Sequence, residues 1–184
     1  MPNNNTFKLS SKRQNLFLRL AKGHFATSHS HINYYIDVTM QKSRLSEAQA
    51  VAEELCAYYH NTIVDTILCL DGTEVIGTCL AAKLTKSSYV SMNAHQTIYV
   101  VTPETSNGQL LFRDNIVPMI QSKHVLILAV SVASGNTVRA AMDAVKYYGG
   151  RATAFSVSLN AEDSVFLSDL KMEFSTVGSG DYRI

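Results

Sequence analysis

Residues 131–137, with the sequence Ser-Val-Ala-Ser-Gly-Asn-Thr, have the residue types of an anion-binding turn. They follow the longest apolar run of the chain, 125–130, and precede a stretch with helical apolar spacing. Where a buried strand leads into a helix, backbone N–H groups converge near the positive end of the helix dipole. Gly135 lets that backbone approach a ligand closely, and Ser134 and Thr137 supply hydroxyl donors. A phosphate monoester fits these features; an ordinary helix N-cap is the alternative, because short motifs of this kind are common.

A second polar break, Asp71-Gly72-Thr73-Glu74, separates two apolar segments. Two carboxylates at this spacing could coordinate magnesium together with the oxygens of a substrate. The alternative is structural: Glu74 would begin a helix, where the helix dipole favours a carboxylate by up to about 1 kcal/mol. The residues alone leave both interpretations open.

Three histidines, His24, His29 and His31, lie close together in the sequence. A structural zinc site needs four ligands, and no cysteine or aspartate follows at a recognisable spacing. Substrate contacts or surface positions are therefore the favoured interpretation. The adjacent Tyr34 and Tyr35 either cover a sheet or offer one ring to stack on a base.

The elements that must position these residues alternate along the chain. The apolar patterns predict strands at 34–38, 66–70, 89–92, 97–101, 124–130 and 152–159. They predict helices at 10–21, 46–60, 75–84 and 114–121, and one from Thr137 to a glycine cap at 149–150. Residues 102–109 have turn chemistry and no apolar period, which predicts a mobile loop. This order indicates an α/β fold with right-handed crossovers and a mainly parallel sheet flanked by helices, in which ligands bind at the carboxyl ends of the strands.

Composition and charge limit the partners of the chain. Its 184 residues are 46% hydrophobic and 17% charged, with a net charge of +1, which is typical of one globular domain. The near-neutral charge argues against nucleic acid or an anionic membrane as a partner. No apolar run is long enough to span a membrane, and no secretory leader is recognised at residues 1–21. Three cysteines without C-x-x-C spacing are expected to be reduced core residues, so we expect a cytoplasmic protein.

Three segments together resemble the type I phosphoribosyltransferases, and in particular the orotate phosphoribosyltransferases. Residues 125–137 are similar to the ribose-phosphate signature of that family: four apolar residues, two acids, two apolar residues and a Thr/Ser-Gly-x-Thr loop. Residues 23–37 are similar to its N-terminal substrate segment. Residues 65–84 match its strand, its pyrophosphate loop at 71–77 and its small-residue helix with Ala81 and Ala82. The matches span roughly residues 16–159 in the family order.

The resemblance implies a phosphoribosyltransferase-like fold in a single domain, 1–184, with an N-terminal hood or substrate segment at 1–40 and an α/β core at 41–170. It implies a phosphate or nucleotide ligand, no organic cofactor, and a homodimer with residues 32–38 at the contact, and magnesium is an option through Asp71 and Glu74. The implied site residues fall into four groups. They are Ala133, Ser134, Gly135, Asn136 and Thr137 for phosphate; Asp71, Gly72, Thr73 and Glu74 for pyrophosphate; His31, Tyr34 and Tyr35 for the base; and Asp71, Glu74 and His95 as candidates for catalysis.

The departures from the family pattern bear on activity. Ala129 and Val130 stand where the signature has its two acids, and no Lys or Arg occurs at 87–112, where basic residues would meet pyrophosphate. His31 falls near the position of the orotate-binding lysine. These losses predict very low or absent turnover of orotate. Two functions stay open: transfer of a phosphoribosyl group from phosphoribosyl pyrophosphate to a nucleobase, and a catalytically degenerate regulatory module that binds a nucleotide or phosphoribosyl pyrophosphate. A third, structural role without a ligand is weaker.

Overall fold

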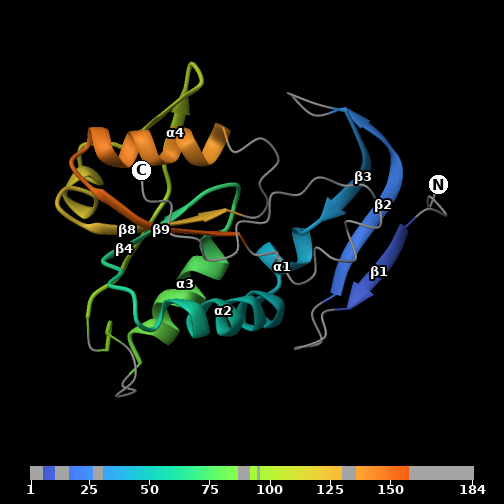
Figure 1. The fold of residues 1–184 in the computed structure, drawn as a ribbon, viewed down its shortest axis with the longest axis horizontal. Helices are drawn as coiled ribbons and strands as arrows, with labels where there is room; N and C mark the ends of the chain where they lie inside the picture. Colours follow the sequence, from blue (N-terminus) through green and yellow to red (C-terminus); the bar gives the residue numbers. More distant parts are fainter. Residues whose placement is uncertain are drawn as a thin grey trace.

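A computed structural model describes residues 6–10, 17–26, 31–86, 92–94, 96–129 and 136–157 (Figure 1). The strands are β1 (Thr6–Ser10), β2 (Phe17–Ala26), β3 (His31–Asp37), β4 (Thr66–Cys69), β5 (Tyr99–Val101), β6 (Glu104–Ser106), β7 (Gln109–Leu111), β8 (His124–Ala129) and β9 (Arg151–Val157). The helices are α1 (Thr39–Ser43), α2 (Leu45–Tyr59), α3 (Glu74–Leu84), α4 (Asn136–Tyr147) and the 3-10 turn η1 (Val117–Met119).

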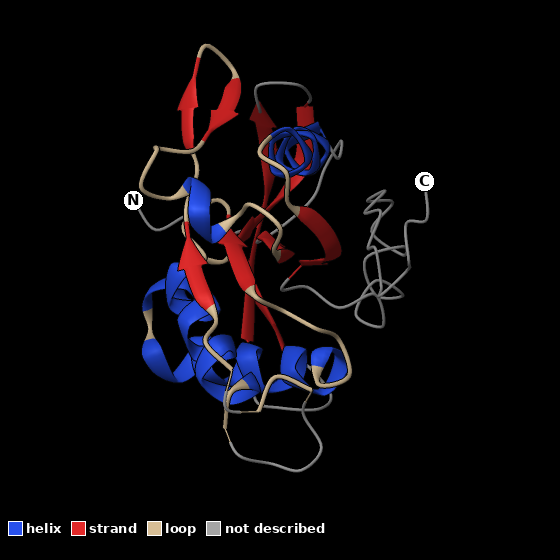
Figure 2. Ribbon diagram, turned by 90° about the vertical axis from the view of Figure 1, so that its left-hand side faces the viewer, coloured by secondary structure: helices blue, strands red, loops and turns tan. Residues whose placement is uncertain are grey.

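A four-stranded parallel sheet forms the centre of the molecule, in the order β5-β4-β8-β9. Helix α4 covers one face of this sheet, and helices α2 and α3 cover the other (Figures 1 and 2). The predicted α/β architecture with a mainly parallel sheet is therefore confirmed. Among the described residues, no helix is long and apolar enough to cross a membrane.

Strand β8 explains the long apolar run, because both of its faces are buried. Val125, Ile127 and Ala129 pack in the cluster under α4, whereas Leu126 and Leu128 pack in the cluster with α2 and α3. A central strand of a covered parallel sheet needs apolar side chains at every position. Its continuous hydrophobicity is thus a direct consequence of the three-layer arrangement.

The N-terminal region contradicts the predicted helix at 10–21. Strand β2 pairs antiparallel with β1 and with β3, and residue 19 lies opposite both Lys8 and Asp37. The apolar spacing of residues 16 and 20 was interpreted as helical, but the same positions also fit the two-residue period of a strand. Pairing on both sides satisfies the backbone of β2, which decides between the two patterns.

Two further predictions need correction, and one cannot be compared. The expected loop at 102–109 contains the β6–β7 hairpin, whose turn residues Asn107 and Gly108 have φ values of 50° and 77°. Positive φ at both positions is typical of a two-residue hairpin turn. The helix at 114–121 is reduced to η1. The strand at 89–92 lies outside the described residues except for Met92, which is in a turn.

The remaining helices and strands occur within a few residues of their predicted bounds. The three cysteines are free, as expected: Cys69 is buried, and Cys56 and Cys79 are half-buried. Burial raises the pKa of the Cys69 thiol to about 12, which keeps it protonated and unreactive.

Candidate functional site

The loop after β4 contacts the end of β8 at the carboxyl edge of the sheet. Cys69 pairs with Leu128, and the Leu70 N–H donates to the Leu128 carbonyl oxygen at 2.8 Å. The fully buried Thr73 hydroxyl lies 2.9 Å from the Leu70 carbonyl oxygen and 3.1 Å from the Leu128 carbonyl oxygen. Its single proton is shared between two strands, so the loop after β4 is anchored to the end of β8.

The chain leaves these two strands in opposite directions. From β4 it passes through α3 to β5 on one side, and β8 lies on the other side of β4 and leads through α4 to β9. Helices α3 and α4 therefore diverge to opposite faces of the sheet (Figure 1). The position between β4 and β8 is the topological switch point, where open parallel sheets form their ligand-binding crevice.

The loop after β4 has an unusual backbone. Asp71 and Gly72 both lie in the left-handed region, with φ values of 54° and 80°. Aspartate tolerates this conformation better than most residues, and glycine adopts it without penalty. Two consecutive left-handed residues turn the chain sharply and direct the Asp71 carbonyl oxygen toward helix α1.

Lys42 of α1 reaches this loop. Its ammonium donates to the Asp71 carbonyl oxygen at 2.7 Å. A Cβ atom on Gly72 would lie 3.6 Å from Lys42 Nζ and 3.9 Å from Glu74 Oε2, so an ammonium and a carboxylate border the same face of Gly72. Lys42 was not predicted as a site residue, because it lies 29 residues before Asp71 and belongs to none of the matched motifs. A basic residue just after the strand at 31–37 is the signal that could have indicated it.

Asp37, at the end of β3, contributes a further charge near Lys42. The Thr39 hydroxyl and the Thr39 backbone N–H, which lies 3.0 Å from Asp37 Oδ1, lower the pKa of Asp37 most. Partial burial acts in the opposite direction, and the charges of Arg19 and Lys42 lower the pKa further. Asp37 is therefore ionised at neutral pH, and the field of Lys42 acts on it as well as on the loop.

The predicted pyrophosphate loop is shorter than expected. Residues 71–77 were assigned to it, but helix α3 begins at Glu74, and the Gly77 N–H donates to the Thr73 carbonyl oxygen at 2.8 Å. Glu74 stands in the first turn of α3, as the structural alternative requires, and it also borders the loop. Both interpretations of Glu74 are compatible with this position.

Close packing of α3 on the sheet depends on Gly77 and Ala81. A Cβ atom at Gly77 would lie only 2.5 Å from Cys69 Sγ, and Ala81 is buried. Ala82, which was expected to pack closely as well, is exposed. The prediction is therefore right for Ala81 and wrong for Ala82, and Gly77, one turn earlier, is the second residue of the small-residue face.

The candidate phosphate turn is described only in part. Strand β8 ends at Ala129 and helix α4 begins at Asn136, which confirms the predicted succession of strand and helix. Asn136 and Thr137 are exposed at the start of α4. Val130, Ala133, Ser134 and Gly135 lie outside the described residues. Ala129 is 1% exposed and packs in the apolar cluster under α4.

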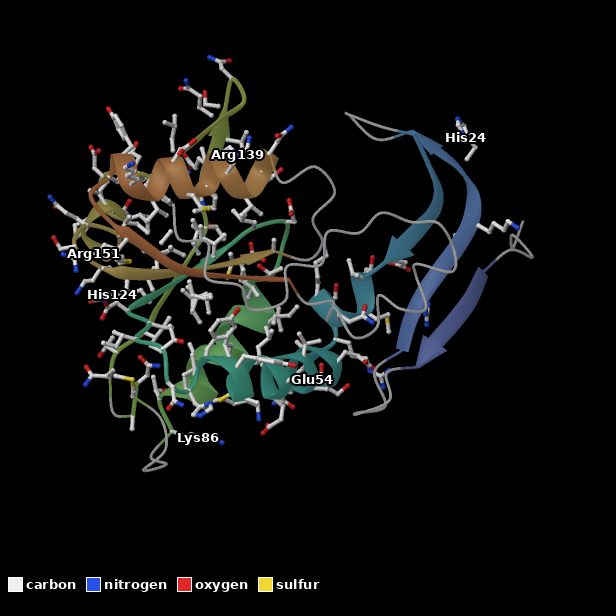
Figure 3. All side chains as sticks on the ribbon, viewed as in Figure 1. His24, Glu54, Lys86, His124, Arg139 and Arg151 are labelled. Carbon is white, nitrogen blue, oxygen red and sulfur yellow. The ribbon has the colours of Figure 1, made fainter. Side chains whose placement is uncertain are left out.

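The candidate base-binding residues belong to β3, and only their backbones are described. Tyr34 and Tyr35 are consecutive residues in the middle of this strand. His31 begins β3, about 20 Å along the strand from α1, which separates it from the loop after β4. His24 lies on the part of β2 that is far from α1 (Figure 3). His29 and His95 lie outside the described residues.

Among the described residues, no three histidine, cysteine or acidic side chains are close enough to hold a metal ion by themselves. Asp71 and Glu74 provide two carboxylates. This set fits a magnesium ion that takes most of its ligands from water and phosphate, and it does not fit a resident structural metal.

A contrasting cluster lies at the amino edge of the same sheet. Asp65 Oδ2 accepts the His124 backbone N–H at 2.7 Å and lies 2.8 Å from His124 Nδ1. Partial burial acts to raise the pKa of Asp65, but these hydrogen bonds and the charges of His124 and Lys123 outweigh it, so the pKa lies below its usual value. His124 and Arg151 are both seen at this end of the sheet (Figure 3).

Comparisons with solved structures identify the fold. An orotate phosphoribosyltransferase of Mycobacterium tuberculosis in complex with Fe(III) dicitrate matches with a TM-score of 0.50 and 14% identity, over 76% of each chain. The UMP synthase of Leishmania donovani matches with a TM-score of 0.55 and 17% identity, over 86% of this chain and 33% of that chain. No family model and no curated protein matches the sequence. The chain thus has the fold of the type I phosphoribosyltransferases.

Proposed function

We propose that the protein binds a ribose 5-phosphate or nucleotide-type ligand at the carboxyl edge of the central sheet. The observation that carries this proposal is the switch point between β4 and β8, where the loop at 71–73 is anchored to the end of β8. The ligand phosphate would be received by the backbone of residues 133–137, at the positive end of α4. A fold supports many functions, so the proposal rests on this edge and its residues.

We further propose that any chemistry is transfer of a phosphoribosyl group from phosphoribosyl pyrophosphate to a nucleobase. Magnesium, when bound, would neutralise part of the pyrophosphate charge, and Asp71 and Glu74 are the residues that would hold it. Orotate turnover is expected to be very low or absent. The missing acids at 129–130, the absence of Lys and Arg at 87–112 and His31 in place of lysine would each cost on the order of 2 kcal/mol.

A degenerate binding module is the second candidate, and the surroundings of Ala129 favour it. In the family pattern this position carries an acid that holds a ribose hydroxyl, whereas Ala129 packs among apolar side chains. A chain that keeps the phosphate turn without the ribose acids would retain binding and lose turnover. Such a module would report the concentration of its ligand to another protein.

Calorimetry with ribose 5-phosphate and with phosphoribosyl pyrophosphate, each in the presence of magnesium, tests the binding. Gly135→Val should abolish it, because a side chain would occupy the space that the anion must enter. Ser106→Val is the control, since Ser106 is exposed in β6 and a strand accepts a β-branched side chain. Unchanged affinity in the Gly135 variant would refute the phosphate turn.

Release of pyrophosphate from phosphoribosyl pyrophosphate, measured with a panel of bases, separates the two candidate functions. Turnover of about 1 to 10³ per second with orotate would contradict the expected loss of activity. Binding without release would support the module.

We also propose a homodimer with residues 32–38 at its contact. Light scattering at micromolar concentration should give twice the 20.3 kDa mass of the chain. The monomer mass alone would contradict it.

A further inference from the structure

Lys42 brings a positive charge to the carboxyl edge from a segment outside every matched motif. Its ammonium lies 2.7 Å from the Asp71 carbonyl oxygen and close to the open face of Gly72. Helix α1, which carries it, contacts both α2 and α3. The lysine is therefore held at the loop by the packing of its helix and by a hydrogen bond across 29 residues.

The charges around Lys42 show why it matters for an anionic ligand. Asp71 and Glu74 place two carboxylates at the loop, and Asp37 places a third within the field of Lys42. Without Lys42, the described side chains that border this loop would present only carboxylates to a diphosphate, and like charges repel. Lys42 is the cation that reduces this repulsion at the loop itself.

Lys42 can donate more hydrogen bonds than the one that it makes to Asp71. A lysine ammonium carries three protons, and among the described residues only the Asp71 carbonyl oxygen accepts one of them. The flexible stem lets the group turn while the backbone of the loop stays in place. Lys42 can thus hold Asp71 and a phosphate oxygen at the same time.

We propose that Lys42 is the specificity-determining residue that makes the loop after β4 accept a diphosphate, and so supplies the cation that residues 87–112 lack. This inference rests on the proposed function, because it concerns the same ligand site. It assigns the two anionic parts of the ligand to different places. Diphosphate depends on Lys42, whereas the monoester phosphate depends on the backbone at the start of α4.

The test measures two probes separately by calorimetry in the presence of magnesium: inorganic pyrophosphate and ribose 5-phosphate. Lys42→Gln should weaken pyrophosphate binding at least about tenfold, the effect of losing one charge-assisted hydrogen bond. It should change ribose 5-phosphate binding less than about twofold. Lys42→Arg, which keeps the charge, should stay within about threefold of the unmodified protein for both probes.

Two further variants serve as controls. Lys86→Gln removes the same charge beyond the opposite end of α3, where Figure 3 labels Lys86, and should leave both affinities unchanged. Lys42→Met keeps the apolar stem of the lysine, so it repeats the test if Lys42→Gln fails to fold. Circular dichroism and the urea midpoint of each variant establish that it is folded.

The outcomes separate this inference from the proposed function. If the unmodified protein binds neither probe, the proposed function is wrong, and the role of Lys42 with it. If it binds ribose 5-phosphate but not pyrophosphate, or if Lys42→Gln leaves pyrophosphate binding intact, the role of Lys42 is wrong and the phosphate site stands. An equal loss for both probes would show that Lys42 only maintains the structure.

Discussion

Two aspartates stand at the two ends of strand β4, and they are used in opposite ways. Asp65, before the strand, gives its carboxylate to the backbone N–H and the ring of His124. Asp71, after the strand, engages Lys42 through its backbone carbonyl oxygen. No hydrogen bond or ion pair to the Asp71 carboxylate is found within the described part of the chain. The Asp65 carboxylate at the amino end of β4 is therefore used within the protein, whereas the Asp71 carboxylate at the carboxyl end is available to a ligand.

The two edges of the sheet differ in how their polar groups are used. At the amino edge, the Asp65 backbone N–H also donates to the His124 carbonyl oxygen, and the Asp65 carbonyl oxygen accepts the Tyr99 N–H. At the carboxyl edge, Thr73 ties the strands together, and Asp71, just before it, adopts a left-handed backbone conformation that is costly for a residue other than glycine. Left-handed backbone and exposed charged side chains thus occur at the edge where ligands bind in this class of fold.

The largest expected effect comes from packing at the carboxyl end of β4. Gly77→Val should lower the free energy of unfolding by about 3 kcal/mol, because its Cβ would lie 2.5 Å from Cys69 Sγ. Urea unfolding measures the change, and Cys69→Ala in the same chain should recover part of it. Thr78→Val is the control on the exposed side of α3, and it should cost far less. Equal losses in the two variants would mean that α3 does not approach β4 this closely.

Ala129→Asp tests the end of β8, next to β4. A carboxylate placed at a position 1% exposed should lower the free energy of unfolding by about 2–3 kcal/mol at pH 7. Burial would raise the pKa of the new carboxyl above its unfolded value of about 3.9. The part of the loss that is due to charge should therefore be present above a pH of about 3.9 and disappear as the pH falls below this value.

Ala129→Asn separates charge from size in this experiment, since it should show a smaller loss that does not depend on pH. A stable Ala129→Asp variant that gains affinity for phosphoribosyl pyrophosphate would place residue 129 in the ligand site. The apolar environment described here would then be the wrong account of that position.

Asp65→Asn compares the two ends of β4 directly. It should lower the free energy of unfolding at pH 7 by about 1 kcal/mol, a modest value because the carboxylate is about one third exposed. The pKa of Asp65 is lowered in the folded protein, so its contribution exists above the unfolded pKa and is lost as the pH falls through the folded value. Urea unfolding at pH 7 and pH 3 should show less acid sensitivity in the variant. Asp71→Asn should change neither stability nor its pH dependence, and a matching effect there would remove the contrast.

The smallest effect is expected away from both ends of β4. Glu53 and Lys83 form an ion pair between α2 and α3, and the Glu53 side chain is largely exposed. Glu53→Gln should lower the free energy of unfolding by no more than about 0.5 kcal/mol. Thermal or urea unfolding in low salt and in 1 M salt checks this, because salt should remove the remaining difference. A loss above 1 kcal/mol would show that this contact supports the core.

The central sheet could be predicted from sequence because its strands are apolar on both faces. Strands β4 and β8 and the helices α2, α3 and α4 follow from burial patterns that tertiary contacts do not alter. Strand β2 was missed because residues 16 and 20 fit two periods at once, and pairing partners decided between them. The β6–β7 hairpin was missed because its strands are three residues long and mostly exposed.

The candidate site was predictable only where a local pattern marks it. Asp71, Gly72 and Glu74 were recognised as a polar break between apolar segments, and they do border one loop. Lys42 reaches that loop through the packing of α1, a long-range arrangement that residue spacing does not encode. The phosphate turn at 133–135, the single domain and its subdivision at residue 40 stay predictions.

The pairing of β4 with β8 also determines when the ligand site can form during folding. Asp65 and His124 are 59 residues apart, so closing this loop costs about 3.6 kcal/mol in its length-dependent part alone. The β1–β2–β3 meander needs only short closures and can assemble quickly. The two loops that flank the switch point follow β4 and β8, so both depend on this distant pairing. The carboxyl edge, where we propose the ligand site, is therefore completed late, after the local elements have already formed.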